Sequence, residues 1–444
     1  MSSLAAMKTL DQIAAELQGY DPDALRAGDV VAFLAKMVEP LSQTQQLPLM
    51  EALGRVLVQD IVSPISVPPH DNSAMDGYAF VGGDLAASGD TRLRVVGTAL
   101  AGKAWQGHLT RGDCVKIMTG AIMPGATDTV APKEIVRIAE GAAGESFIAL
   151  PAGMVRIGDN RRFQGEDLLA GSPALQRGDV LVPAALGLVA SLGIAQVPVY
   201  RRLKVAYFST GDEILSLGEP VREGAVFDSN RYTVFGLLTR MGCEVIDLGV
   251  VRDEPARLEA AFKQAAESAD AVITSGGVSV GEADHTKAMM KKLAGDEADG
   301  GGVAFWRIAM RPGRPMAVGR IPAGNGRQAV LFGLPGNPVA VMVTFLAFVR
   351  PTLLRMMGAR SSAPVLLRAR SLEAMRKKPG RTEYQRGIVT QDNHGALSVR
   401  TTGNQGSGVL SSMVQANGLI VLRHEQGDVA LGDEVDVMMF EGVI

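Results

Sequence analysis

The sequence is poor in the residues that stabilise secreted or zinc-bound folds. Its 444 residues include only two cysteines, Cys114 and Cys243, which are far apart and form no CxxC pair. Disulfide-based stability is therefore not expected, and this cysteine usage fits a reducing compartment. The five histidines are scattered, so a structural zinc site is not expected either. The N-terminus lacks the basic and apolar segments of a signal peptide, and we expect a cytoplasmic protein.

An excess of charge of one sign is also missing. The chain has 44 basic and 47 acidic residues and a net charge of -3. Such a balance gives no electrostatic basis for binding nucleic acid or an anionic membrane, so neither is expected as a partner. The uncharged stretch 328–349 is interrupted by Leu334-Pro335-Gly336-Asn337-Pro338. This interruption predicts a core strand, a turn and a helix instead of a membrane span.

What the sequence does contain predicts an α/β multidomain protein, because 444 residues exceed one core and hydrophobic residues make up 47%. Residues 63–165 show short β-like runs between glycine and proline turns, which indicate a β-rich inserted module. Strands alternate with helices over 201–360, which predicts a doubly wound, mainly parallel, three-layer α/β/α domain. Short strands over 361–444 predict a C-terminal β-barrel. The flanking segments 22–62 and 166–200 are assigned to a small linking α/β domain.

Ligands of a doubly wound sheet bind at the carboxyl ends of its strands, and a glycine-rich loop follows one of these strands. The loop runs from Ser275 through Gly276 and Gly277 to Gly281, with Asp284 just beyond it. Backbone amides in such a loop can bind phosphate. The alternative is an ordinary strand-to-helix turn in which Asp284 caps the helix. The two best-known nucleotide-binding signatures are absent.

Charged residues also gather at these strand ends. Glu213, Asp253 and Asp284 are acidic residues of the kind that hold Mg²⁺ together with phosphate oxygens, although each one alone could be a helix cap or a solvated turn residue. Arg311 and Arg314 flank a Pro-Gly turn, and Arg307 precedes it. Their guanidinium groups could clamp a phosphate or another oxyanion, or they could be solvated surface groups.

Several long motifs are spread along the chain. They include a polar stretch, 71–79, that hydrophobic periodicity does not explain and that could also be a loop of Asx turns. The motifs are Pro69-His70-Asp71-Asn72-Ser73-Ala74-Met75-Asp76-Gly77-Tyr78-Ala79, Ile117-Met118-Thr119-Gly120-Ala121, Phe208-Ser209-Thr210-Gly211-Asp212-Glu213, the loop from Ser275 to Asp284, and Gly333-Leu334-Pro335-Gly336-Asn337-Pro338. These motifs resemble the MoeA family of molybdopterin molybdotransferases, which is related to the gephyrin E domain, and the resemblance runs from about residue 22 to the C-terminus.

This resemblance implies a reaction in which adenylylated molybdopterin and molybdate give molybdenum cofactor and AMP, with Mg²⁺ or a similar divalent cation. It implies a homodimer whose cleft joins the α/β domain of one subunit to the β-rich module of the other. A molybdopterin adenylyltransferase and recipient molybdoenzymes are candidate partners. Matching positions are, for catalysis, Asp76, Thr119, Glu213, Asp253 and Asp284; for the metal, Glu213, Asp253 and Asp284; and for substrate or oxyanion, Asp167, Ser275, Gly276, Gly277, Gly281, Arg307, Arg311, Arg314, Pro335, Arg386 and Ser407.

The sequence departs from the family pattern at a few positions. Relatives often have lysine at the three positions held here by Arg307, Arg311 and Arg314, so this chain offers planar forks where they offer point charges. His285 replaces a common tyrosine, and residues 295–302 form an unusual insertion. Two alternatives remain: an adenylyltransferase that prepares the same substrate, and a scaffold similar to gephyrin. The β-rich module and barrel disfavour the first, and the lack of a fused adenylyltransferase domain disfavours the second.

Overall fold

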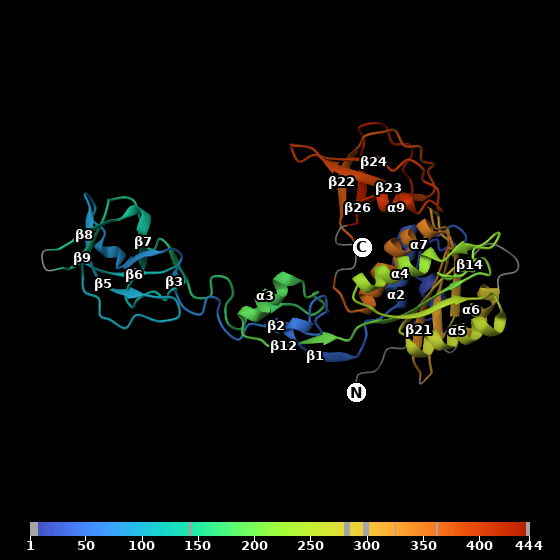
Figure 1. Cartoon of the computed structure of the whole chain (residues 1–444), viewed down its shortest axis with the longest axis horizontal. Coiled ribbons are helices and arrows are strands. Elements are labelled where there is room, and N and C mark those ends of the chain that lie inside the picture. The colour runs from blue at the N-terminus through green and yellow to red at the C-terminus, as the bar shows by residue number, and fades with distance from the viewer. Residues whose placement is uncertain are drawn as a thin grey trace.

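The computed structural model describes residues 8–141, 144–278, 285–295, 302–324, 326–360 and 363–440. The molecule is elongated (Figure 1). A β-rich module lies at one end, a small unit containing α3 lies in the middle, and a large α/β unit lies with a β-barrel at the other end. The chain leaves the middle unit for the module and returns to it, so the module is an insertion, as its sequence pattern predicted.

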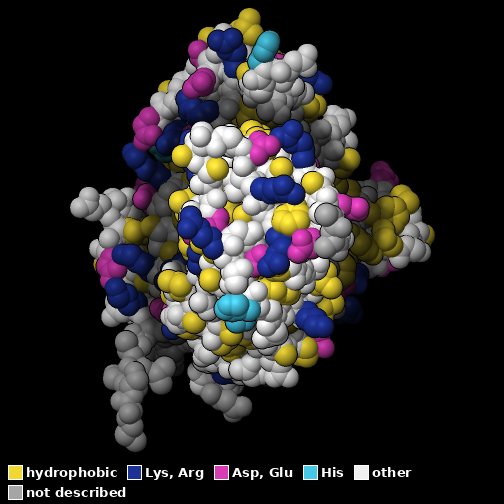
Figure 2. Space-filling model, turned by 90° about the vertical axis from the view of Figure 1, so that its left-hand side faces the viewer, with side chains coloured by type: hydrophobic (Ala, Val, Ile, Leu, Met, Phe, Trp, Pro, Cys, Tyr) yellow, Lys and Arg dark blue, Asp and Glu magenta, His cyan; other side chains and the backbone are white. Residues whose placement is uncertain are grey.

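The β-rich module is a six-stranded sheet in the order β7-β4-β6-β5-β9-β8. Its strands are β4 (Gly77–Phe80), β5 (Thr91–Ala99), β6 (Asp113–Ile117), β7 (Thr129–Pro132), β8 (Arg137–Glu140) and β9 (Ser146–Leu150), and η2 (Gly82–Asp84) and η3 (Lys133–Ile135) are 3-10 turns between them. Apolar side chains such as Phe80 and Ile148 fill one core, and Ile117 and Val130 fill another. Lys, Arg, Asp and Glu are interspersed on the end face of this module (Figure 2).

The middle unit is built by pairing segments from the two sides of the insertion. β1 (Thr44–Pro48) pairs with β12 (Gln196–Tyr200), and β2 (Ile61–Val62) pairs with β11 (Pro173–Leu175), both antiparallel. α3 (Pro183–Ser191) and the 3-10 turn η1 (Leu49–Glu51) complete it. Closer to the module, β3 (Asn72–Ser73) pairs with β10 (Arg161–Arg162), so the outgoing and returning chains are held side by side.

The α/β unit contains a six-stranded sheet in the order β16-β13-β17-β21-β20-β18. The strands are β13 (Lys204–Thr210), β16 (Glu244–Val251), β17 (Ala271–Ser275), β18 (Gly302–Arg307), β20 (Pro315–Pro322) and β21 (Gln328–Leu334). The first four in spatial order are parallel and β20 is reversed. β20 is reversed because its connections to β18 and β21 are too short for a parallel crossover. β18, antiparallel to β20, therefore ends at the same edge as the parallel strands.

Helices cover both faces of this sheet and give the expected three layers. One face packs against α2 (Ala27–Met37), α4 (Ser229–Arg240) and the helical stretch α7 (Pro338–Thr344), the π segment η5 (Phe345–Val349) and α8 (Arg350–Met356). The other face packs against α5 (Pro255–Ser268) and α6 (His285–Ala294). The helical periodicity correctly placed α4, whose end is marked by Gly242 with φ +78°.

The apolar stretch that raised the question of a membrane span is a core element. The continuous helix Pro338–Met356 has the length and composition to cross a membrane, but 67% of its apolar 18-residue window is buried inside the protein. It follows β21 through the turn at 335–337, so the predicted strand, turn and helix are confirmed. An additional helix, α1 (Leu10–Ala15), was not predicted. A capping box between Thr9 and Gln12 begins it, and Leu10 and Ile13 are buried against the α/β unit.

The C-terminal unit is a closed barrel, which confirms the predicted fold class. Its strands are β22 (Leu366–Ser371), β23 (Thr382–Gln391), β24 (Leu397–Thr401), β25 (Gly418–Leu422) and β26 (Glu434–Met439), with the short helix α9 (Ser411–Gln415). Pairing of β23 with β25 closes the ring. β19 (Met310–Arg311) pairs with β23, so the arginine turn after β18 is tied to the barrel.

Candidate functional site

A cleft opens at the carboxyl edge of the α/β sheet, where it meets the barrel. Its larger cavity has a volume of about 630 Å³, and a second cavity of about 450 Å³ shares four lining residues with it. The shared residues are Glu213, Gly276, Gly336 and Asn337, so the two cavities form one cleft. Of the residues predicted from sequence, the larger cavity brings together Glu213, Gly276, Gly277, Arg311, Arg314, Pro335 and Ser407, and the smaller cavity adds Ser275.

The glycine loop requires glycine at its first two positions. Gly276 and Gly277 have φ values of +90° and +64°, which other residues rarely adopt. A Cβ on Gly276 would lie 2.5 Å from the Thr210 carbonyl oxygen, and one on Gly277 would lie 2.4 Å from the Thr286 Cβ. The Gly276 amide donates to the Leu334 carbonyl at 3.1 Å, so this amide is not available to a ligand. Gly281 and Asp284 lie outside the described residues.

Beneath the loop is a buried polar network that the sequence patterns did not reveal. The Tyr207 hydroxyl lies 2.6 Å from Ser275 Oγ and 2.9 Å from Ser209 Oγ. Burial raises the pKa of the Tyr207 hydroxyl. Asn230, at the start of α4, donates to the Gly336 carbonyl at 2.8 Å. This network fixes the loops after β17 and β21, and its only sequence signal was a tyrosine in an apolar strand.

Two of the three predicted arginines face the larger cavity. Arg311 and Arg314 have no ion pair or side-chain hydrogen bond to any described residue, so their guanidinium groups are available to an anion. Between them, Gly313 has φ +94°, and a Cβ there would lie 2.5 Å from Thr344 Cγ2 of α7. The Pro-Gly turn is thus pressed against the helix, which fixes the position of both arginines.

Arg307 is outside this cleft, contrary to the expectation of a cluster of three. It ends β18, where its amide donates to the Pro22 carbonyl at 2.7 Å and its carbonyl accepts from Leu25. Its side chain forms a 3.7 Å ion pair with Asp23. The N-terminal segment therefore occupies the space beside Arg307. The spacing of the three arginines in the sequence gave no indication of this contact.

The predicted metal-binding carboxylates are only partly brought together. Glu213 lines both cavities, whereas Asp253 lines neither. The Asp253 amide donates to Asp212 Oδ1 at 3.2 Å, and Asp253 Oδ1 accepts from Thr286 Oγ1 at 3.3 Å. Within the described part of the chain, no group of three or more His, Cys, Asp or Glu residues could hold a metal. Two carboxylates still fit Mg²⁺, which needs only one or two together with phosphate oxygens and water.

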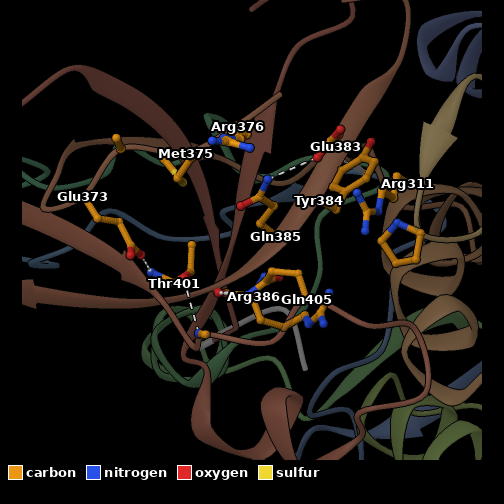
Figure 3. Close-up of a pocket in the computed structure, with 13 residues that line it drawn as sticks. Arg311, Glu373, Met375, Arg376, Glu383, Tyr384, Gln385, Arg386, Thr401 and Gln405 are labelled. Carbon is orange, nitrogen blue, oxygen red and sulfur yellow. Dashed lines mark hydrogen bonds between the residues drawn. The ribbon is translucent and has the colours of Figure 1, made fainter. Parts of the chain in front are cut away.

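Arg386 lies in a third cavity, of about 220 Å³, between the barrel and Arg311 (Figure 3). Its side chain is buried, with Nε donating to Ser412 Oγ at 3.0 Å and Nη2 donating to the carbonyls of Asn404 and Gly406 at 3.2 and 2.9 Å. Burial and, secondarily, the charge of Arg311 lower the pKa of Arg386 to about 10. Three of its five donors are therefore engaged inside the barrel, two by the loop that carries Ser407 and one by Ser412 of α9, which makes Arg386 primarily a positioning residue.

Asp76 and Thr119 form their own cluster in the β-rich module. Asp76 Oδ1 accepts from the Thr119 amide at 2.9 Å and from its hydroxyl at 2.8 Å, and Oδ2 accepts from Lys133 at 3.1 Å. The Thr119 amide, the Thr119 hydroxyl and Lys133 lower the pKa of Asp76 to about 2. Asp167 is exposed where the chain returns from the module, and its amide donates to Val67. Within one chain, the module lies at the opposite end of the molecule from the cleft (Figure 1).

The fold and the cleft define a multidomain α/β protein that has a ligand cleft at the carboxyl ends of its parallel strands. Three family models match consecutive parts of the chain. They are the MoeA N-terminal region (domain I and II) over residues 25–193, the "Probable molybdopterin binding domain" over residues 206–355, and the MoeA C-terminal region (domain IV) over residues 368–440.

Similarity to known proteins extends over nearly the whole chain. A molybdopterin molybdenumtransferase of Haemophilus influenzae is 42% identical over 92% of this chain and 98% of its own length. One from Nostoc is 32% identical over 94% and 93%. A crystal structure of a molybdopterin biosynthesis moeA protein from Pyrococcus horikoshii has a TM-score of 0.75 and 27% identity, covering 94% of this chain and 100% of that one. The chain belongs to the MoeA family.

Proposed function

We propose that this protein inserts molybdate into adenylylated molybdopterin and releases AMP and molybdenum cofactor. Membership of the MoeA family makes it a transferase of molybdenum cofactor biosynthesis. The observation that supports the specific reaction is the cleft itself. In it, two arginines that pair with no described residue line one cavity together with a glycine loop and a carboxylate. Such a cavity suits the binding of a phosphate-bearing substrate together with a second, oxyanionic substrate.

The chemistry assigned to the chain is electrostatic. Arg311 and Arg314 neutralise the negative charges of phosphate and molybdate, so that the two anions can approach each other. They also stabilise the negative charge of AMP as it leaves. Ser407 and the amide of Gly277 are further donors at the cavity wall. No nucleophilic side chain is required. Water attacks the phosphoanhydride and AMP leaves, while the two dithiolene sulfur atoms bond to molybdenum and displace two oxo groups of molybdate, which leave as water with the thiol protons and protons from solvent.

A Mg²⁺ ion belongs to the same proposal. Glu213 and Asp253, together with Asp284, are the side chains assigned to hold it at the strand ends. When bound, the ion supplies neutralisation of charge on the phosphate oxygens. Because Asp253 is not a lining residue, its contribution is assigned to the rim of the cleft, next to Thr286.

A homodimer in the cytoplasm completes the proposal. The Asp76–Thr119–Lys133 cluster is exposed and lies far from the cleft of its own chain, so it would act on the cleft of a second copy. Exposed apolar side chains near the returning chain, such as Phe163 and Leu169 with 54% and 58% exposure, offer surface for such a contact. A molybdopterin adenylyltransferase would supply the adenylylated molybdopterin, and recipient molybdoenzymes would accept the molybdenum cofactor.

The direct test is anaerobic incubation of the purified chain with adenylylated molybdopterin and Mg²⁺, with and without molybdate. We expect AMP release that depends on molybdate, and loss of this release in Arg311→Gln. Consumption of ATP with free molybdopterin would instead identify an adenylyltransferase. Normal molybdoenzyme activity in a deficient strain carrying this chain excludes a purely scaffolding role, whereas failure to restore it would favour one.

A further inference from the structure

The N-terminal segment, residues 8–25, is packed into the α/β unit, although the match to the MoeA N-terminal region begins only where this segment ends. Leu10 and Ile13 of α1 are buried in the main core of the unit. The buried guanidinium of Arg320, in β20, donates to the Lys8 carbonyl at 2.8 Å. The segment therefore lies outside the matched region but is fixed to the sheet by packing and by a hydrogen bond.

The end of this segment runs beside the chain that leads into the arginine turn. The Arg307 amide donates to the Pro22 carbonyl at 2.7 Å, and the Ala309 amide donates to the Leu25 carbonyl at 2.8 Å. On its other side, the Ala309 carbonyl accepts from the Thr382 amide of β23 at 2.9 Å. This stretch of chain therefore lies between the N-terminal segment and the barrel, and it loses one of its two neighbours if the segment moves.

One side-chain hydrogen bond also links the segment to this stretch. Trp306, which is 2% exposed, donates from Nε1 to the Tyr20 hydroxyl at 2.9 Å. Both rings pack against Phe33 of α2, with centroid distances of 4.9 Å for Trp306 and 6.2 Å for Tyr20. By contrast, the 3.7 Å ion pair between Asp23 and Arg307 is exposed and contributes little stability. Tyr20 is therefore the side chain through which the segment holds the end of β18.

We propose that Tyr20 is a positioning residue for the two arginines of the cleft. This inference rests on the proposed function and deepens it. Trp306 comes shortly before Arg311 in the chain, and the Ile308 amide donates to the Arg314 carbonyl at 2.7 Å, which closes the turn. A shift at Trp306 therefore moves both guanidinium groups relative to the rest of the cavity. Two guanidinium forks bind anions tightly only when their positions are fixed, so a loosened segment lowers anion affinity without removing any anion ligand.

Thermodynamic linkage gives a test on the unmodified chain. If the segment positions the arginines, an anion bound between them must in turn stabilise the segment. We expect saturating molybdate to slow hydrogen exchange of the peptides covering 17–25 and 305–310 by about 3- to 10-fold, and to leave exchange of α3 in the middle unit unchanged. Unchanged exchange of 17–25, with molybdate protecting the arginine turn, would overturn the proposal.

Tyr20→Phe in the full chain tests the contact itself, because it keeps the ring and removes the acceptor of the Trp306 indole N–H. A buried donor left unpaired weakens the attachment of the segment. We expect molybdate to bind about 3- to 10-fold more weakly in equilibrium dialysis. The KM for molybdate should rise by a similar factor, while kcat changes by less than about twofold.

Asp23→Asn is the matched control, because it lies in the same segment and removes the exposed ion pair with Arg307. It should leave molybdate affinity within about twofold of the wild-type value. A Tyr20→Phe chain that is less stable but binds molybdate as tightly as the wild type would show a merely structural contact and refute the proposal. Absence of molybdate-dependent AMP release from the wild-type chain would refute the proposed function alone, because dialysis and hydrogen exchange measure binding without the reaction. A wild-type chain that binds no molybdate at millimolar concentration would overturn both.

Discussion

Arg386 provides a stringent test of how the barrel shapes the cleft. Replacement by alanine removes a buried guanidinium whose donors hold Ser412 Oγ and the carbonyls of Asn404 and Gly406. Each acceptor left unpaired costs roughly 1–3 kcal/mol, and part of this cost is recovered because a buried charge is no longer desolvated. We therefore expect the barrel to lose about 3 kcal/mol of stability.

A local measurement is needed, because unfolding of a multidomain chain is not two-state. Hydrogen exchange of the peptides covering 402–409 and β23 reports opening of this loop directly. A loss of about 3 kcal/mol corresponds to exchange roughly 100-fold faster. Arg386→Lys should be intermediate, because an ammonium group keeps the charge but cannot span three separate acceptors.

Arg376→Ala is the matched control. Arg376 lines the same cavity, but it is exposed and bonds to no described residue (Figure 3). Its replacement should change the opening free energy by no more than about 0.5 kcal/mol. If Arg386→Ala and Arg376→Ala gave the same exchange rates, the loop would not depend on the buried guanidinium, and the assignment of Arg386 as a positioning residue would be wrong.

Three further outcomes follow from the cleft and the module. Arg311→Gln should weaken molybdate binding in equilibrium dialysis by about 10- to 100-fold, whereas Arg307→Gln, outside the cavity, should leave it nearly unchanged. Gly277→Ala should cost roughly 1–3 kcal/mol in local stability, seen by hydrogen exchange of the loop, because φ is +64° and a Cβ would meet Thr286. The Asp76 carboxyl should titrate near pH 2 in an NMR titration. Because its pKa is lowered from 3.8, its stabilising contribution is present above pH 3.8 and is lost as the pH falls through about 2, and a midpoint near 3.8 would contradict the contacts assigned to it.

Local patterns were sufficient for the elements that position the cleft. Helix α5 and strand β16 begin and end where the sequence predicted. A proline begins the helix, and the spacing of apolar residues indicates the extent of both elements. The rule that ligands bind at strand ends also selected the glycine loop, the arginine turn and the turn after β21. These features depend on neighbours in the chain, which a sequence displays directly.

Other features depended on neighbours far apart in the chain. Arg307 and Arg311 are four residues apart, yet only Arg311 faces the cavity, because residues 22–25 lie against the end of β18. Arg386 is a residue type that often binds anions, but in the folded chain two of its donors bond to the 404–406 loop and a third bonds to Ser412. Neither outcome has a signature in the local sequence.

The sequence by itself determined the family, the types of secondary structure and the residues that carry charge at the strand ends, because these follow from local order and composition. Only the tertiary structure decided which of those charges share a cavity. It also showed that one part of the cleft contains arginines while the other contains acidic side chains. Burial and pairing depend on which distant segments meet, and that is a property of the folded chain.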